Sequence, residues 1–358
     1  MKVEVSLFLL LVLMLFSVSL SVYAEEITID LENYIKISLE NSRELKEAEL
    51  NLNEKEINLK EVEAELEVNP SPLLLARAEL ELELAEKNLL RKEDELINKY
   101  INEFFNYYKT ENLIEVHQKY LSVLENEMEN IKDKYQQGLL TKSDIYKAEV
   151  ELKTAQSNLV KAENNNQRAA FILKQSLKAK KDDQLEIQFS KEDLKAWKLD
   201  EDFNELLKTA IKHRIEIKEA EVNKDLKNIN YKLAAGEYSP KLKEKEAENE
   251  YLSAVNNKEI LKDMVELDLN NSYLNFKDSI ENIKRDRKLI ESYKEALRVK
   301  KLYFAEDYIT GTELLETQVD LYQAEVSLSH SEIDYYLNLA ELYLSTGDFK
   351  ELLVYAEK

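Results

Sequence analysis

The stretch that decides the fold is Asn69–Lys87, NPSPLLLARAELELELAEK, in which leucine and glutamate alternate after two prolines. Alternation with a period of two is typical of a strand with one apolar and one polar face. Alanine, leucine and glutamate are also among the strongest helix formers. The segment is therefore either a strand that could lie in a membrane or the start of a long helix.

The composition of the chain favours helices over strands. Its 358 residues include 4 glycines and 3 prolines, whereas average usage is about 7% glycine and 5% proline. Because these two residues form most tight turns, a chain with so few of them cannot contain many short strands. Charged residues make up 34% of the chain, which is typical of long, solvated helices joined by few turns.

The N-terminal residues indicate that the protein is exported. Lys2 precedes an apolar run over residues 7–18, and small residues precede a polar segment at Ala24. This pattern is typical of a secretory signal peptide, so we predict cleavage after Ala24. An uncleaved membrane anchor is the alternative, because Glu4 weakens the positively charged start. No other run approaches the ~20 apolar residues that a membrane-spanning helix needs.

Charge and residue usage limit the classes of partner and site. The formal net charge of −22 repels nucleic acids and anionic lipid surfaces. The chain has no cysteine, so it can form neither disulfides nor thiolate metal sites. Its three histidines, His117, His213 and His330, are scattered, and no nucleophile–base pair or phosphate-binding glycine loop can be recognised. We therefore expect no enzyme activity, no metal and no cofactor.

The sequence is a tandem duplication. The segment LENYIKISLENSRELKEAELNL from Leu31 aligns with FNELLKTAIKHRIEIKEAEVNK from Phe203. The segment YQQGLLTKSDIYKAEVELKTAQ from Tyr135 aligns with FAEDYITGTELLETQVDLYQAE from Phe304. Similar segments in the same order and at nearly constant separation mark an internal repeat. Each half is predicted to contain a helix, a proline turn, a very long helix, a tight turn and a returning helix.

This repeat predicts an all-α fold of long antiparallel helical hairpins with coiled-coil packing. Leu73–Gln137 alone would form a helix of about 100 Å. In the first returning helix, apolar or small residues step by three and four, as in a coiled coil: Ile145, Ala148, Leu152, Ala155, Leu159 and Ala162. The predicted organisation is a signal peptide (1–24), a first helical repeat (25–180), a connector (181–202) and a second helical repeat (203–358). One short strand is expected in the connector, at Gln184–Phe189.

The tight turns carry recognisable helix-capping signals. In YQQGLLTKSDIYKAEVEL, Gly138 can adopt the left-handed conformation that ends a helix. Thr141 then begins the next helix as its N-cap, with Asp144 in the first turn. In the second copy, FAEDYITGTELLETQVDL, Thr310 and Glu313 have the spacing of a capping box.

The paired first helices, both turns and the closing segment SEIDYYLNLAELYLSTG resemble the TolC-like outer membrane efflux proteins. The resemblance extends over essentially the whole chain after the signal peptide. It implies a homotrimer whose hairpins form a hollow periplasmic tunnel. It also implies a periplasmic adaptor at the hairpin tips, an inner-membrane pump beyond that adaptor, and a place in the outer membrane or periplasm of a two-membrane bacterium.

The resemblance also implies which residues form the functional site. The adaptor-contacting tips would be Gly138, Leu139 and Thr141 in the first half and Asp307, Tyr308 and Thr310 in the second. Glu313 and Glu316 match acidic residues that narrow the aperture in this family. In a trimer they would bring six carboxylates together, which raises the pKa of some of them. Alternatively, the turn residues only close the hairpins and the two glutamates are part of a solvated first turn.

The chain departs from the family at the proline turns, where family members insert pairs of membrane strands. The second-half segment SPKLKEKEAENEYLSAVNN carries charges on both alternating faces, and each charge facing lipid would cost about 2–4 kcal/mol near mid-membrane. We therefore predict helices in both segments and few or no membrane strands. The alternative function is a non-transporting periplasmic scaffold or adaptor. A channel subunit should differ from it by a second apolar stripe, for which Leu140, Val150 and Val160 are candidates.

Overall fold

The computed structural model describes residues 26–67, 71–189, 202–236, 239–306 and 308–347. The predicted signal peptide lies outside these residues. The first half contains β1 (Glu26–Ile29), α2 (Leu31–Asn41), α3 (Arg43–Leu66), α4 (Pro72–Gln136), α5 (Lys142–Leu177) and β2 (Gln184–Ile187). The second half contains α6 (Phe203–His213), α7 (Ile215–Ala234), α8 (Lys241–Ala305) and α9 (Gly311–Thr346).

The two halves repeat each other in the lengths of their helices. The long helices α4 and α8 have 65 residues each, and the returning helices α5 and α9 have 36 each. The short helices α2 and α6 have 11 residues each. The predicted fold of long helical hairpins is confirmed, and the matching lengths agree with the predicted internal repeat.

The stretch with alternating leucine and glutamate is helical, as predicted. It forms the start of α4, and Pro72 is its first residue, where the missing N–H of proline costs no hydrogen bond. Ala78 and Ala85, seven residues apart, are buried, which is the spacing of a helix face rather than of a strand. No helix in the described ranges is both long and apolar enough to cross a membrane.

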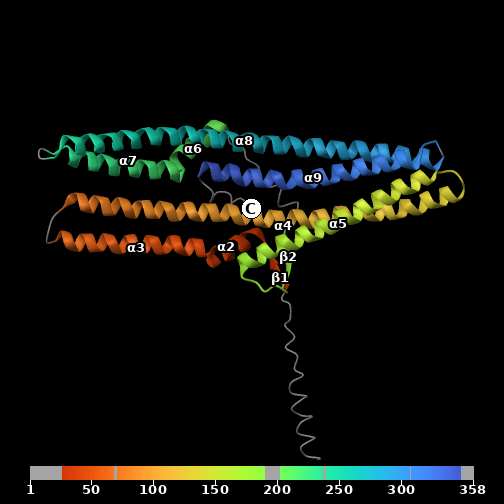
Figure 1. Cartoon of the computed structure of the whole chain (residues 1–358), viewed down its shortest axis with the longest axis horizontal. Helices are drawn as coiled ribbons and strands as arrows, with labels where there is room; N and C mark the ends of the chain where they lie inside the picture. The colour runs from red at the N-terminus through yellow and green to blue at the C-terminus, as the bar shows by residue number, and fades with distance from the viewer. Residues whose placement is uncertain (1–25, 68–70, 190–201, 237–238, 307, 348–358) are drawn as a thin grey trace, which may run out of the picture.

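The long helices lie side by side along the length of the molecule (Figure 1). Toward the proline turns the order of contacting helices is α3, α4, α7, α8, and toward the other end it is α5, α4, α9, α8. Helix α8 therefore forms one edge along the whole molecule. Helices α3 and α5 together form the opposite edge.

The main apolar core lies where the two halves meet in the middle of the molecule. Its largest buried side chains include Tyr34, Phe104 and Phe105. The Phe105 ring stacks on that of Tyr336 from the other half, with centroids 5.6 Å apart. The aromatic pairs of the sequence are thus packing layers between helices, and rings in such pairs contribute about 0.5–1.5 kcal/mol beyond their buried area.

A two-stranded parallel sheet covers one side of this core. β2 coincides with most of the strand predicted at Gln184–Phe189, and it pairs with β1, with Ile27 opposite Leu185. The sequence analysis missed β1, because four residues directly after a predicted cleavage site are too short for a pattern. A strand needs a partner for its backbone N–H and C=O groups, and β1 supplies it.

The predicted coiled-coil seams of the returning helices are buried in part. On α5, Ile145, Leu152 and Leu159 of the seam are half-buried, whereas four alanines that recur every seven residues are buried: Ala148, Ala155, Ala162 and Ala169. The corresponding α9 positions Thr317, Ala324 and Ser331 are also buried. Small side chains at these positions let each returning helix approach its long partner closely.

Candidate functional site: the hairpin tips

The first tip is a tight turn that ends α4. Gly138 has φ +77°, its N–H donates to the carbonyl of Tyr135 (2.9 Å), and the N–H of Leu139 donates to the carbonyl of Lys134 (2.9 Å). These two bonds form the Schellman motif that satisfies the last carbonyls of a helix. The prediction that Gly138 adopts the left-handed conformation is confirmed.

The second tip ends α8 with a matching bond, from the N–H of Tyr308 to the carbonyl of Tyr303 (2.8 Å). Asp307, predicted as a tip residue, lies outside the described residues. The side chains of Leu139 and Tyr308 are 52% and 78% exposed. Both tips therefore present a large apolar or aromatic side chain to solvent.

Both returning helices begin with a full capping box. The side chain of Thr141 accepts from the Asp144 N–H, and the Asp144 carboxylate accepts from the Thr141 N–H (2.8 Å). Thr310 and Glu313 form the same pair of bonds. Hydrogen bonds from Thr141 lower the pKa of Asp144 below its usual value, and hydrogen bonds from Thr310 lower the pKa of Glu313.

Glu313 and Glu316 follow the second turn, and the ring that they would form with two further copies stays a prediction. In the single chain the Glu313 carboxylate is bound in the cap, and the hydrogen bonds from Thr310 lower its pKa. Glu316 lines a groove between α5 and α9 together with Asp320 and Lys147. The sequence analysis missed Asp320, although its spacing of four from Glu316 places it on the same helix face.

The two tips of one chain are tied to each other. The hydroxyl of Thr312 donates to Asp144 (3.0 Å), so one cap contacts the other. Lys134 donates to the carbonyl of Phe304 (2.8 Å), and its ammonium lies 4.2 Å from the centroid of the Phe304 ring. These bonds could not be predicted from local patterns, because they join residues about 170 positions apart, on the two copies of the repeat.

Leu140 does not contribute to a second apolar stripe, contrary to the sequence-based expectation. It packs with Ile145 against buried Met128, Ile131 and Ala148. It also lies close to Gly311, where an added Cβ would be 3.6 Å from its side chain. The reason is the Schellman turn, which directs the chain after Leu139 back onto α4.

Removing either cap hydroxyl should loosen its tip. We expect Thr141→Ala and Thr310→Ala each to lower the free energy of unfolding by about 1 kcal/mol, the usual loss at an N-cap. Urea unfolding measures the loss, and amide exchange in the first turn of α5 or α9 locates it. Thr141→Ser and Thr310→Ser retain the hydroxyl and are the controls. Equal stability of the alanine and serine variants would contradict a capping role.

The Asp144 bond should also depend on pH. Because the folded-state pKa of Asp144 lies below its ordinary value of 3.8, its contribution to stability is complete above that value. The contribution is lost as the pH falls through the folded-state pKa.

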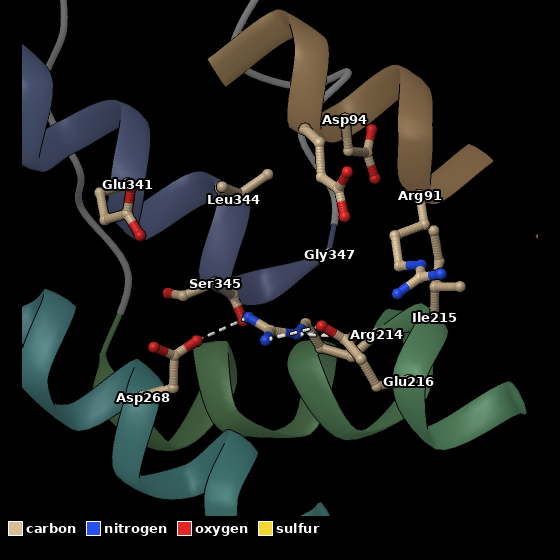
Figure 2. A pocket seen from close by; sticks show the side chains of 11 residues that line it. Arg91, Asp94, Arg214, Ile215, Glu216, Asp268, Glu341, Leu344, Ser345 and Gly347 are labelled. Atoms are coloured by element: carbon tan, nitrogen blue, oxygen red, sulfur yellow. Dashed lines mark hydrogen bonds and ion pairs between the residues drawn. The ribbon is translucent and has the colours of Figure 1, made fainter. Parts of the chain in front are cut away.

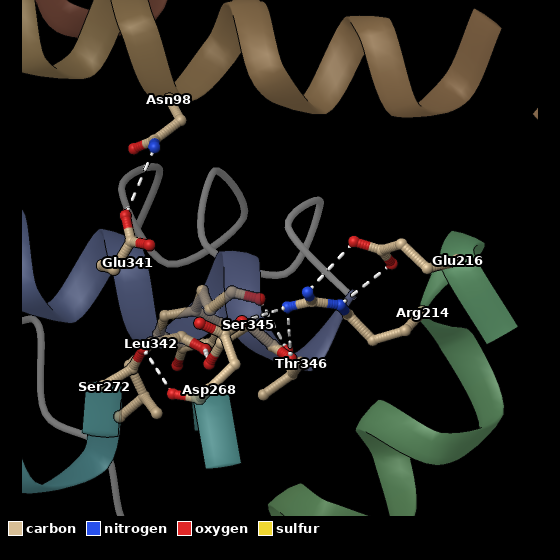
Figure 3. A network of polar contacts seen from close by, with 10 residues as sticks. Asn98, Arg214, Glu216, Asp268, Ser272, Glu341, Leu342, Ser345 and Thr346 are labelled. Carbon is tan, nitrogen blue, oxygen red and sulfur yellow. Dashed lines mark hydrogen bonds and ion pairs between the residues drawn. The ribbon is translucent and has the colours of Figure 1, made fainter. Parts of the chain in front are cut away.

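A second candidate is a pocket in the middle of the molecule (Figure 2), between α4, the α6–α7 junction, α8 and the end of α9. Arg214 donates to Glu216 (3.1 and 3.0 Å), to Asp268 (2.8 Å) and to the carbonyl of Ser345 (3.2 Å) (Figure 3). The guanidinium is thus occupied by protein groups and caps the C-terminus of α9. Asn41 bonds the matching carbonyl of Ser176 at the end of α5 (3.3 Å). The pocket is therefore lined by a structural junction, and its contact with the end of α9 has a counterpart at the end of α5.

No protein-family model and no curated protein sequence matches this chain. The structure is similar to that of CusC, with a TM-score of 0.76 and 14% identity over 92% of this chain and 95% of CusC. For the outer membrane protein VceC from Vibrio cholerae, the TM-score is 0.74 and the identity is 14%, over 88% of this chain and 96% of VceC. For the MtrE outer membrane channel from Neisseria gonorrhoeae, the TM-score is 0.73 and the identity is 16%, over 89% of this chain and 89% of MtrE. The chain therefore has the helical fold of the TolC-like outer membrane channels that its sequence resembles.

Proposed function

We propose that this protein is a subunit of a TolC-like export channel. Three copies form a helical tunnel that works with an inner-membrane pump and a periplasmic adaptor, in the outer membrane or periplasm of a two-membrane bacterium. The adaptor contacts the tips, through Gly138, Leu139 and Thr141 and through Asp307, Tyr308 and Thr310. The observation that carries this proposal is a pair of unpartnered apolar stripes on the two opposite edges of the molecule.

The first stripe follows α8. Most of its exposed apolar side chains lie on one face of the helix and extend over most of its length: Leu242, Ile260, Met264, Leu267, Leu274, Leu289 and Tyr303. Two others, Leu252 and Leu302, are exposed outside this face. The side chains of α8 that pack inward, such as Phe276 and Ile290, lie on another face. A scaffold that remains a single chain would leave this apolar edge exposed to water, and monomeric soluble proteins rarely expose large apolar patches.

The second stripe lies on the opposite edge. On α5 it consists of Tyr146, Val150, Val160 and Phe171, which are 53–66% exposed. At 100° per residue these four lie within a narrow sector opposite the buried alanine seam. On α3, Leu50 and Ile57 are exposed one heptad apart. Val150 and Val160 were both expected here from the sequence.

Two different stripes on opposite edges support head-to-tail association. A contact in which α8 of one copy packs against α3 and α5 of the next is heterologous, and such contacts form a closed ring when the rotation between copies closes. Apolar burial is the main favourable term in most protein association. A closed ring of helices encloses a lumen, as a tunnel requires.

The test uses the natural absence of cysteine. We would prepare Val160→Cys and Leu289→Cys, on opposite edges of the tip half, and treat them with a bifunctional thiol reagent. The two variants mixed together should form covalent dimers, whereas each variant alone should not. The double variant should form a ladder that ends at three chains.

Other results would favour a different interface or the alternative function. Dimers of one variant alone would indicate a two-fold interface, which cannot form a tunnel. No cross-linking, together with a monomeric mass by light scattering, would favour the scaffold or adaptor alternative. Once a trimer is established, substrate efflux in cells that lack their own channel would test export itself.

A further inference from the structure

The two halves of the chain have helices of equal length, but they are covered to different extents. Since α8 begins at residue 241 where α4 begins at 72, and α9 at 311 where α5 begins at 142, each residue of α4 or α5 matches the residue 169 positions later. Within one chain α4 packs against α9, whereas the matching helices α8 and α5 lie on opposite edges (Figure 1). The contact of α4 with α9 therefore has matching surfaces that a single chain cannot bring together.

The exposed apolar residues of α5 match buried residues of α9. Tyr146 is 54% exposed and matches Leu315, which is 8% exposed and shares an apolar cluster with Tyr120 of α4. Phe171 is 58% exposed and matches Ala340, which is fully buried. Along α9, all of which the structure describes, no large apolar residue is exposed. The face of α5 that meets water thus corresponds to the face with which α9 contacts α4.

The same difference is seen when α8 is compared with α4. Leu289 is 38% exposed and matches Tyr120, which is 5% exposed and stacks on Tyr322 of α9. Leu274 is exposed and matches Phe105, which is fully buried and stacks on another tyrosine of α9. Both leucines belong to the first stripe. This stripe is therefore uncovered at positions whose counterparts on α4 are covered by α9.

The agreement continues toward the proline turns. There α3 begins at residue 43 and α7 at 215, so Leu50 matches Val222. Leu50 is 58% exposed, whereas Val222 is 5% exposed on a helix that contacts α4. The edge formed by α3 and α5 thus matches, at both ends of the molecule, the surface of α7 and α9 that covers α4.

We propose that a second copy of the chain covers these edges in the register that the chain already uses internally, so that α8 of one copy packs against α5 of the next as α4 packs against α9. This inference rests on the proposed channel and adds to it which residues meet. In a ring of three chains, six halves would then follow one another through contacts of one kind, three within chains and three between them.

A contact in the middle of the molecule predicts an apolar contact between copies. Asn98 of α4 donates to Glu341 of α9 (3.3 Å). The matching residues are Leu267 on α8 and Ile172 on α5 of the next copy. Both are apolar and exposed in the single chain, so their contact would remove apolar surface from water.

A contact at the tips predicts a hydrogen bond between copies. The Asp144 carboxylate uses Oδ2 in its cap and accepts from Thr312 with Oδ1 (3.0 Å). The matching residues are Glu313 and Ser143 of the next copy, again a carboxylate and a hydroxyl. Glu313 likewise uses Oε2 in its cap, which leaves Oε1 to accept from Ser143.

One matching pair differs in kind from its counterpart. Ile131 lies close to Gly311, where an added Cβ would be 3.5 Å from its side chain. The matching residues are Lys300 and Lys142 of the next copy. Lys300 donates to the Glu313 carbonyl of its own chain (2.9 Å), and the Lys142 ammonium lies 5.4 Å from the centroid of the Tyr146 ring. Each ammonium therefore has a partner within its own chain.

The test asks whether a reagent that links a pair within the chain also links the matching pair between chains. Asn98→Cys and Glu341→Cys, combined in one full-length mature chain, are the internal standard for choosing a short bifunctional thiol reagent. Leu267→Cys and Ile172→Cys are then made as separate variants and co-expressed. We expect the same reagent to join them into a product with the mass of two chains. Each variant expressed alone should remain a single chain.

The matched control replaces Leu267→Cys by Leu274→Cys. Leu274 is also exposed and lies on the same stripe, but it is one heptad away, or about 10 Å along the helix. A short reagent should therefore give little product between Leu274→Cys and Ile172→Cys. All these positions except those of the internal standard are exposed, so the chain should fold with cysteine there.

Two results would overturn the inference and leave a three-chain channel standing. One is more product with Leu274→Cys than with Leu267→Cys, which would mean a different register. The other is a trimeric mass by light scattering with neither product, which would mean that other surfaces meet. A monomeric mass with neither product would overturn the proposed channel as well.

Discussion

Gly347→Ala is expected to destabilise the protein by several kcal/mol, far more than the same change at Gly138. Gly347 ends α9 in the left-handed conformation, with φ +70°, where a side chain costs about 1–2 kcal/mol. A Cβ there would also lie 2.8 Å from the backbone nitrogen of Arg214 and 3.0 Å from its Cα. These are main-chain atoms of the α6–α7 junction, so they cannot move away without disturbing that junction.

Gly138 is the matched control, because it has nearly the same conformation, with φ +77°, but a Cβ there would meet nothing within 4 Å. Gly138→Ala should therefore show only the conformational cost of about 1–2 kcal/mol. The difference between the two variants in urea unfolding isolates the contact between the end of α9 and the α6–α7 junction. Equal losses would mean that this junction yields easily and that the close approach has little energetic weight.

Val160→Asp is expected to separate the copies of the proposed trimer without unfolding the chain. Val160 is 53% exposed in the single chain, so a carboxylate there remains solvated when the chain is monomeric. In the ring it would face the apolar stripe of α8 and lose water. A buried unpaired charge of this kind costs several kcal/mol, and each 1.4 kcal/mol weakens an equilibrium tenfold. We expect association to weaken by about 100-fold or more.

The control is Asn165→Asp, which adds the same charge at an exposed position about 140° around the helix from Val160. Light scattering over a range of concentrations compares the two variants with the natural chain, and circular dichroism checks that each is helical. A Leu289→Lys change should restore part of the association of Val160→Asp if the two side chains meet across the interface. A trimer unaffected by Val160→Asp would place the interface elsewhere.

The amino-acid sequence by itself determined the helical architecture. Capping residues and turn glycines act within a few residues of each other, so the turns at Gly138 and Thr310 could be recognised from local patterns. The scarcity of glycine and proline, and the repeat between the two halves, predicted long hairpins. The alternating stretch before Lys87 was correctly assigned to a helix because its second copy carries charges on both faces.

Only the tertiary structure decided which side chains meet across the helices. The bonds of Lys134 to Phe304 and of His117 to Tyr322 join residues 170 and 205 positions apart. The pairing of β1 with β2 likewise depends on how the first half folds back on itself. The physical reason is that local patterns specify where each helix begins and ends and which face is apolar. Rotation and register against a distant helix arise from packing of the whole chain.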